Sequence, residues 1–277
     1  MSSPTEEISN FAFLHIKSDK NKRMTQLCIS AIESEIIVSG NAKRVDNKTI
    51  NLCFNPSGGE QSEMMSLLTK NISNFAFLHI SSTGLPEREG NNTRITELCI
   101  TVIESKNIVN GVHTRVKNKI NLCFKPGKDI TAEAVKQSGL SNSDLENQAS
   151  FSSEVGNCLN GFLNLIDGPI CFVAHYGNEF DYPILRAALS RAGQSLNENI
   201  LCVDSTRFFQ YHERVEQRIR QTWALRDIYQ ELTSIHPTSS HTAEGFVDCL
   251  IYCVSRYAHD FVIWANKDAR TFSSIHH

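Results

Sequence analysis

The sequence lacks any pair of cysteines in a C-x-x-C arrangement, and its nine cysteines are an odd number. Most of them lie inside apolar runs such as Leu98-Cys99-Ile100. This pattern argues against a disulfide framework and against a zinc site. It indicates small, buried hydrophobic residues in a reducing compartment.

Long apolar runs and an excess of positive charge are also missing. No apolar run reaches about 18 residues, and residues 1–10 are polar, without the apolar segment of a signal peptide. We therefore expect a soluble chain of the cytoplasm or nucleus with no membrane partner. Because 27 Lys and Arg face 30 Asp and Glu, a nucleic-acid partner would need a local basic surface.

An internal repeat is present in the first half of the chain. Three segments occur twice: ISNFAFLHI at 8–16 and 72–80, TQLCISAIES at 25–34 beside TELCITVIES at 96–105, and NKTINLCFNP at 47–56 beside NKINLCFKP at 118–126. The apolar runs and polar turns of each copy predict a three-stranded meander. We therefore expect a partial duplicate with its linker at 1–70 and a main domain at 71–277.

After the second copy the pattern changes to alternating helices and strands. The sequence predicts helices at 144–166, 181–192 and 223–232, a long helix opened by His241, and short strands at 168–175 and 200–203. A meander followed by this alternation predicts a mixed α/β sheet with helices on its faces.

Four ordered segments point to one family. They read FLHISSTGLPE at 77–87, FVAHYGNEFDYPIL at 172–185, CVDSTRFF at 202–209 and HTAEGFVDCL at 241–250. This series resembles the three-prime repair exonucleases, which are DEDDh 3′→5′ exonucleases with an RNase H-like fold. The resemblance covers residues 72–275, about three quarters of the chain. It implies single-stranded DNA or DNA 3′ ends as partners.

The resemblance also implies a metal site and a general base. In the family, four carboxylates hold two Mg²⁺ ions and a histidine acts on the attacking water. By resemblance Asp181 is a metal ligand and His241 is the base, but His79, Ser81 and Phe246 replace the other motif carboxylates. We therefore expect Mg²⁺ or Mn²⁺ binding that is weak or lost, and an exonuclease with impaired catalysis.

Two other functions stay open. The first is a working exonuclease that assembles a Mn²⁺ site from His79, Asp181 and His241. Glu244 and Asp248 offer no substitute for the missing carboxylates, because each lies two residues from Phe246, about 200° around a helix. The second is a non-catalytic interaction protein that uses a sheet edge.

The resemblance assigns nucleic-acid contacts to the turn Thr83, Gly84, Leu85 and Pro86. There Leu85 would wedge against a terminal base, although Gly84 could simply permit a turn. We also assign such contacts to His175 and Tyr176, where Tyr176 stands in place of the family's Asn.

Several residues keep two interpretations at this stage. Asp181 suits a helix cap as well as a ligand, and His241 suits a structural role at a helix start. His79 is either a new ligand or a neutral replacement. The basic run 214–220 is either a solvated helix face or a phosphate contact.

By resemblance, the strand at 119–124 is a sheet edge through which family members form homodimers. The first copy supplies a nearly identical strand at 49–54. We expect the first copy to pack on that edge or to compete for it.

Overall fold

The structure is a computed structural model. It describes residues 11–18, 24–32, 47–53, 71–111, 117–216, 220, 222–237 and 241–275. The chain divides into two compact units, Met1–Thr69 and Lys70–His277.

The first unit contains a three-stranded antiparallel sheet in the order β1-β2-β3. Its strands are β1 (Phe11–Ser18), β2 (Met24–Ile32) and β3 (Asn47–Cys53). The predicted meander of the first copy is therefore confirmed. The predicted linker at 57–70 lies outside the described residues.

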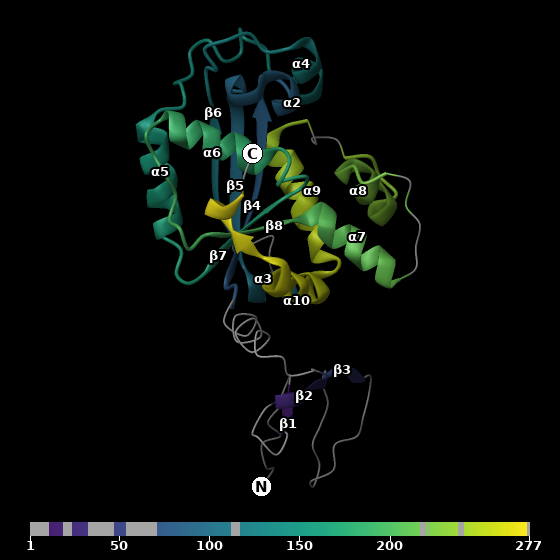
Figure 1. The fold of residues 1–277 in the computed structure, drawn as a ribbon. Coiled ribbons are helices and arrows are strands. Elements are labelled where there is room, and N and C mark those ends of the chain that lie inside the picture. The colour runs from purple at the N-terminus through teal and green to yellow at the C-terminus, as the bar shows by residue number, and fades with distance from the viewer. Residues whose placement is uncertain are drawn as a thin grey trace, which may run out of the picture. The chain divides into compact units, whose positions relative to one another are not determined.

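The second unit is built on a six-stranded sheet in the order β6-β5-β4-β7-β8-β9 (Figure 1). Its strands are β4 (Asn74–Ser82), β5 (Ile95–Glu104), β6 (Asn118–Cys123), β7 (Ile170–Ala174), β8 (Leu201–Asp204) and β9 (Arg270–Thr271). The second copy forms the antiparallel part β4-β5-β6, and β7 and β8 run parallel to β4. The predicted mixed α/β sheet is confirmed.

Nine α-helices are described in this unit. They are α2 (Pro86–Glu89), α3 (Ser105–Val109), α4 (Ala132–Ser138), α5 (Ser153–Asn164), α6 (Asp181–Arg191), α7 (Ser205–Val215), α8 (Leu225–Thr233), α9 (Ala243–Ser255) and α10 (Ala258–Asp268). Two short 3₁₀ turns, Gly90–Asn92 and Phe272–Ser274, complete the helical segments described.

Two predicted helices were wrong in extent. The helix predicted at 144–166 begins only at Ser153, because the polar residues before it form turns. The long helix predicted from His241 is two helices, and Tyr257 between them has a φ of −126°. Both helices bury apolar residues in the same core cluster. The apolar residues therefore recur at helical spacing across the break, although the helix itself is interrupted.

The sheet separates two hydrophobic clusters, because successive side chains of a strand point to opposite faces. Phe75 and Phe77 of β4 pack with residues of α7, α9 and α10. Leu78 and Ile80 pack with residues of α5 and α6. By the same alternation His79 lies on the α9 face, near the end of β4.

The cysteines largely match their prediction. Five are free and buried: Cys99, Cys171, Cys202, Cys249 and Cys253. Burial raises the pKa of the Cys99 thiol to about 11, so it stays protonated. Cys158 is exposed, contrary to the general expectation. Within the described part of the chain, every helix is too short or too polar to cross a membrane.

Candidate active site

Asp181 and His79 meet where the end of β4 approaches the start of α6. The Asp181 side chain is buried, and its Oδ1 accepts a hydrogen bond of 2.8 Å from the backbone N–H of Ile80. His79 Nδ1 lies 3.2 Å from the same oxygen. That approach is not a hydrogen bond, and His79 Nδ1 has no hydrogen-bond partner among the described residues. The other carboxylate oxygen, Asp181 Oδ2, likewise has none among them.

The prediction that Asp181 caps its helix was wrong. The cap position of α6 is Phe180, and Asp181 is the first helical residue. Because its carboxylate accepts from Ile80 instead, Asp181 joins the helix to the central strand. A buried bond between two elements far apart in the sequence fixes the position of this carboxylate.

Phe246 of α9 packs against the ring of His79. The two rings are stacked, with centroids 3.8 Å apart and planes inclined by 16°. At the start of α9, the Thr242 hydroxyl accepts a hydrogen bond of 3.0 Å from Gly245 N. The two residues expected to replace motif carboxylates, His79 and Phe246, are therefore in direct ring contact.

Glu97 is a site residue that the sequence analysis missed. It is buried on β5, directly opposite Ser81 in the strand register. Its Oε2 accepts a hydrogen bond of 2.8 Å from Ala243 N, at the positive end of α9. The sequence did hold one signal for Glu97. The two repeat copies differ at this position, where the first copy has Gln26 and the second has the carboxylate of Glu97.

The residues at this site do not fit a two-metal centre. Among the described residues, no three His, Cys, Asp or Glu side chains gather so as to hold a metal ion. As predicted, Glu244 and Asp248 supply no replacement, because both contact Lys119 of β6, at 2.7 and 3.5 Å. Asp181 therefore lacks the additional carboxylates that a Mg²⁺ pair requires.

His241 lies one residue before the cap Thr242 and is exposed. No hydrogen bond or ion pair connects it to another described residue. Its ring lies beside Gly139, where an added Cβ would be 3.6 Å from His241 Cδ2. The structure thus brings together His79, Asp181 and Phe246, and records no contact between His241 and them.

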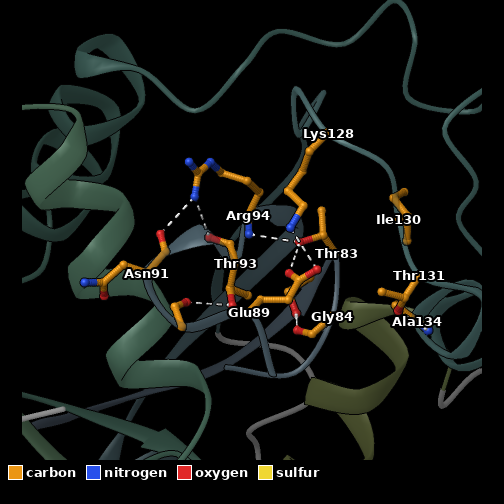
Figure 2. Close-up of polar contacts among 12 residues, drawn as sticks. Thr83, Gly84, Glu89, Asn91, Thr93, Arg94, Lys128, Ile130, Thr131 and Ala134 are labelled. Atoms are coloured by element: carbon orange, nitrogen blue, oxygen red, sulfur yellow. Dashed lines mark hydrogen bonds and ion pairs between the residues drawn. The ribbon is translucent and has the colours of Figure 1, made fainter. Parts of the chain in front are cut away.

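The turn Thr83–Pro86 is held by a polar network (Figure 2). The Thr83 hydroxyl donates to Glu89 Oε2 at 2.7 Å and accepts from Arg94 N at 3.1 Å. Lys128 Nζ lies 2.8 Å from Glu89 Oε1. Burial acts to raise the pKa of Glu89, but hydrogen bonds from Lys128 and Thr83 outweigh it and hold the pKa below its usual value.

Close packing explains the glycine in this turn. A Cβ on Gly84 would lie 2.9 Å from Glu89 Cδ and 3.2 Å from Thr131 Cγ2. Its φ is outside the left-handed region, so space rather than backbone freedom requires glycine here. The next residue, Leu85, remains 41% exposed, so a rigid turn presents an apolar side chain to solvent.

His175 is buried and both of its ring nitrogens have partners. Nε2 lies 2.6 Å from Trp223 O and Nδ1 lies 2.8 Å from Ser205 Oγ. A carbonyl only accepts, so Nε2 carries the proton and Ser205 donates to Nδ1 in the neutral ring. Burial lowers the pKa of His175 to about 4. This predicted contact residue therefore supports the site from inside.

Tyr176, by contrast, is 42% exposed. Its φ is +58°, a conformation that few tyrosines adopt. Its backbone N–H donates to Asp204 Oδ1 at 3.1 Å and to Thr206 Oγ1 at 3.0 Å. These bonds hold the strained residue and leave its ring at the surface, beside His175.

The basic run 214–220 is only partly described. α7 ends at Val215, and residues 217–219 lie outside the described residues. Arg220 makes ion pairs with Glu213 and, at 2.8 Å, with Glu231. The charge of Arg220 is thus balanced within the protein.

The sheet order, the parallel β4-β7-β8 strands and the strand-end site define an RNase H-like fold of the DEDDh exonuclease type. Residues 82–244 match the RNase T family model, which is described as exonuclease. The chain belongs to this exonuclease family. Human three prime repair exonuclease 2 is 32% identical over 216 residues, which cover 73% of this chain and 90% of the relative.

Solved structures show the same fold. The zinc-bound complex of E. coli exonuclease I with single-stranded DNA matches with a TM-score of 0.54 and 15% identity. The match covers 69% of this chain and 42% of that chain. The nuclease domain of 3′hExo, a DEDDh family member bound to rAMP, matches with a TM-score of 0.53 and 8% identity, covering 68% and 93%.

Proposed function

We propose that this chain is a nucleic-acid-binding member of its family whose catalysis is impaired. The observation that carries the proposal is the ring stack of His79 and Phe246, which fills motif positions that hold carboxylates in the family. Since charge neutralisation by metals dominates a two-metal mechanism, loss of three ligands should cost several orders of magnitude. Single-stranded DNA and DNA 3′ ends are the proposed partners.

The proposed binding surface consists of residues exposed around this site. Leu85, on its rigid turn, and Tyr176, on its strained loop, offer apolar and aromatic contacts to unpaired bases. Such contacts need no metal and tolerate any base, because every base has a flat face. Thr83, Gly84 and Pro86 shape the turn, and His175 supports the loop from inside.

A direct experiment follows a 3′-labelled single-stranded DNA oligonucleotide with Mg²⁺ and separately with Mn²⁺. Human three prime repair exonuclease 2 serves as the positive control, and Asp181→Ala as the control for residual cleavage. We expect no cleavage by this chain, with the oligonucleotide retained in a filter-binding assay. Cleavage that Asp181→Ala abolishes would overturn the proposed impairment.

One observation favours a second candidate function, an exonuclease with unusual metal use. His79 Nδ1 lies 3.2 Å from Asp181 Oδ1, and both His79 Nδ1 and Asp181 Oδ2 lack hydrogen-bond partners among the described residues. Those two atoms suit a softer ion such as Mn²⁺ better than Mg²⁺. Cleavage in Mn²⁺ alone, lost in both Asp181→Ala and His79→Ala, would establish this second function.

We also propose that β1–β3 are a partial duplicate of β4–β6. In support, equivalent residues pair in both sheets: Phe11 with Ile32 matches Phe75 with Ile103. The register shift at Lys17/Ser18 has its counterpart at Ser81/Ser82.

The edge strand β6 is a proposed homodimer interface, and the first copy is a proposed competitor for it. β6 ends the sheet, and its residues are half-buried or exposed. Such an edge pairs readily with another strand. Deleting residues 1–70 should therefore change the oligomeric state measured by light scattering. An unchanged dimer after the deletion would exclude competition by the first copy.

A further inference from the structure

A second polar site lies on the other face of the sheet. A cavity of about 210 Å³ opens between the start of β5, the end of α6 and the segment after β6. Three cations line it: Arg94, Lys125 and Arg191. Its apolar lining includes Ile95 and Ala188, which belong to the cluster of α5 and α6. Phe246 packs against the opposite cluster, so this cavity is separate from the candidate active site.

The two arginines are oriented by the same pair of carbonyl groups. Arg94 Nη1 donates to Asn91 O at 3.0 Å and to Thr93 O at 3.2 Å (Figure 2). Arg191 Nη1 and Nη2 donate to those oxygens at 2.9 and 3.1 Å. The carbonyls fix both guanidinium groups but carry no net charge, and each guanidinium retains further donors.

Among the residues that the structure describes, no acidic side chain lines the cavity. Within the described part of the chain, Arg94, Lys125 and Arg191 form no ion pair, whereas Lys119, Lys128 and Arg220 each contact a carboxylate. Burial, and then the neighbouring Arg94, lower the pKa of Arg191. Arg94 also interacts electrostatically with Glu89, but that carboxylate already pairs with Lys128. Three cations without a direct ion pair at one concave site create a local positive potential in a protein of net charge −3.

We propose that this cavity binds a phosphate group. Two oriented guanidinium groups match the geometry of phosphate oxygens, and Lys125 adds a mobile point charge at the rim. The volume is below the roughly 300–1,000 Å³ that encloses a drug-sized ligand. The cavity therefore takes the phosphate itself, with the half-buried Phe151 beside whatever is attached to it. The phosphate belongs either to a small free phosphate ester, such as a mononucleotide, or to a nucleic-acid backbone.

The test compares thermal unfolding in inorganic phosphate with that in chloride at the same ionic strength. The variant Lys125→Gln/Arg191→Gln removes two cations whose side chains lie at the exposed rim. The matched control Lys136→Gln/Arg226→Gln removes two exposed cations elsewhere. We expect phosphate to raise the melting temperature of the wild type and of the control, and to have no such effect on the site variant. Because only the phosphate-induced shift is compared, a change in basal stability does not affect the result.

Binding of a single-stranded oligonucleotide at several salt concentrations separates the two sources of phosphate. A backbone site predicts that the site variant lowers the slope of log affinity against log salt by about 0.7, since the cavity holds one phosphate and each lost phosphate contact contributes about 0.7. An unchanged slope with lost phosphate stabilisation supports a free phosphate ester. A phosphate-induced shift that persists in the site variant, or is absent from the wild type, would overturn the proposal. The phosphate-induced shift in melting temperature is independent of the proposed function, since it reads neither cleavage nor oligonucleotide binding, whereas the salt-dependence measurement rests on the proposed binding of single-stranded DNA.

Discussion

The imidazole of His79 lies flat on the phenyl ring of Phe246, with centroids 3.8 Å apart and planes inclined by 16°. The two residues occupy positions from different family motifs, one at the end of β4 and the other in α9. Because they contact each other, the two replacements form one packed unit. Two carboxylates at these positions would repel each other without bound cations, whereas the two rings attract.

Restoring cleavage should therefore need both motifs together. We expect His79→Asp/Ser81→Glu/Phe246→Asp to degrade 3′-labelled single-stranded DNA in Mg²⁺ at least about 100-fold faster than the wild type. Phe246→Asp alone should stay inactive, because it leaves two motif carboxylates missing. The same triple variant carrying Asp181→Ala is the control. Absence of cleavage from a folded triple variant would show that more than these ligands has been lost.

Asp181 should matter for stability even without catalysis. Asp181→Ala removes the acceptor of the buried Ile80 N–H, and an unsatisfied buried donor costs about 1–3 kcal/mol. Asp181→Asn retains an acceptor oxygen and should cost less. Urea unfolding of both variants measures the difference in free energy of unfolding. Equal destabilisation by the two substitutions would contradict a specific role for the Ile80 bond.

The packing around Gly84 gives a matched pair of glycine substitutions. Gly84→Ala places a Cβ against Glu89 and should disrupt its bonds with Thr83 and Lys128, destabilising the protein by about 1–3 kcal/mol. Gly161→Ala, on the exposed face of α5 with nothing within 4 Å, should stabilise by about 0.5–1 kcal/mol. Thermal unfolding of the two variants should show shifts of opposite sign.

The buried neutral His175 predicts a loss of stability at acidic pH. Its pKa is about 4 in the folded protein and ordinarily 6.5, so between these values the unfolded state binds more protons. Stability from this group is complete above pH 6.5 and falls by up to about 1.4 kcal/mol per pH unit toward pH 4. His175→Gln should flatten that part of the urea-unfolding pH profile, and His259→Gln, at an exposed histidine, should not.

The sequence predicted the meander, the two parallel-sheet strands β7 and β8, and the α/β class, because apolar periodicity reports burial directly. The same periodicity led to the wrong prediction of one continuous helix from His241 onward. Val254 of α9 and Phe261 of α10 are buried in one cluster, so their spacing resembles that of a single helix. At the site it identified Asp181 and Phe246, but not that Phe246 stacks on His79. Contacts between distant segments leave no local pattern. Glu97, which binds the start of α9 from β5, was missed for this reason.

Tyr176 should affect stability and binding in opposite directions. Its φ of +58° is unfavourable for tyrosine and is readily adopted by asparagine, the residue of the family motif. Tyr176→Asn should therefore stabilise the fold by up to about 1 kcal/mol. The same change removes an exposed ring and should weaken single-stranded DNA binding by about 1–3 kcal/mol if that ring stacks on a base.

Tyr211→Asn, at another exposed tyrosine on α7, should leave binding unchanged. Fluorescence anisotropy with a labelled oligonucleotide measures affinity, and thermal unfolding measures stability. A tighter complex from Tyr176→Asn would mean that the strained tyrosine blocks the site, and that the binding surface has to be sought around Leu85 instead.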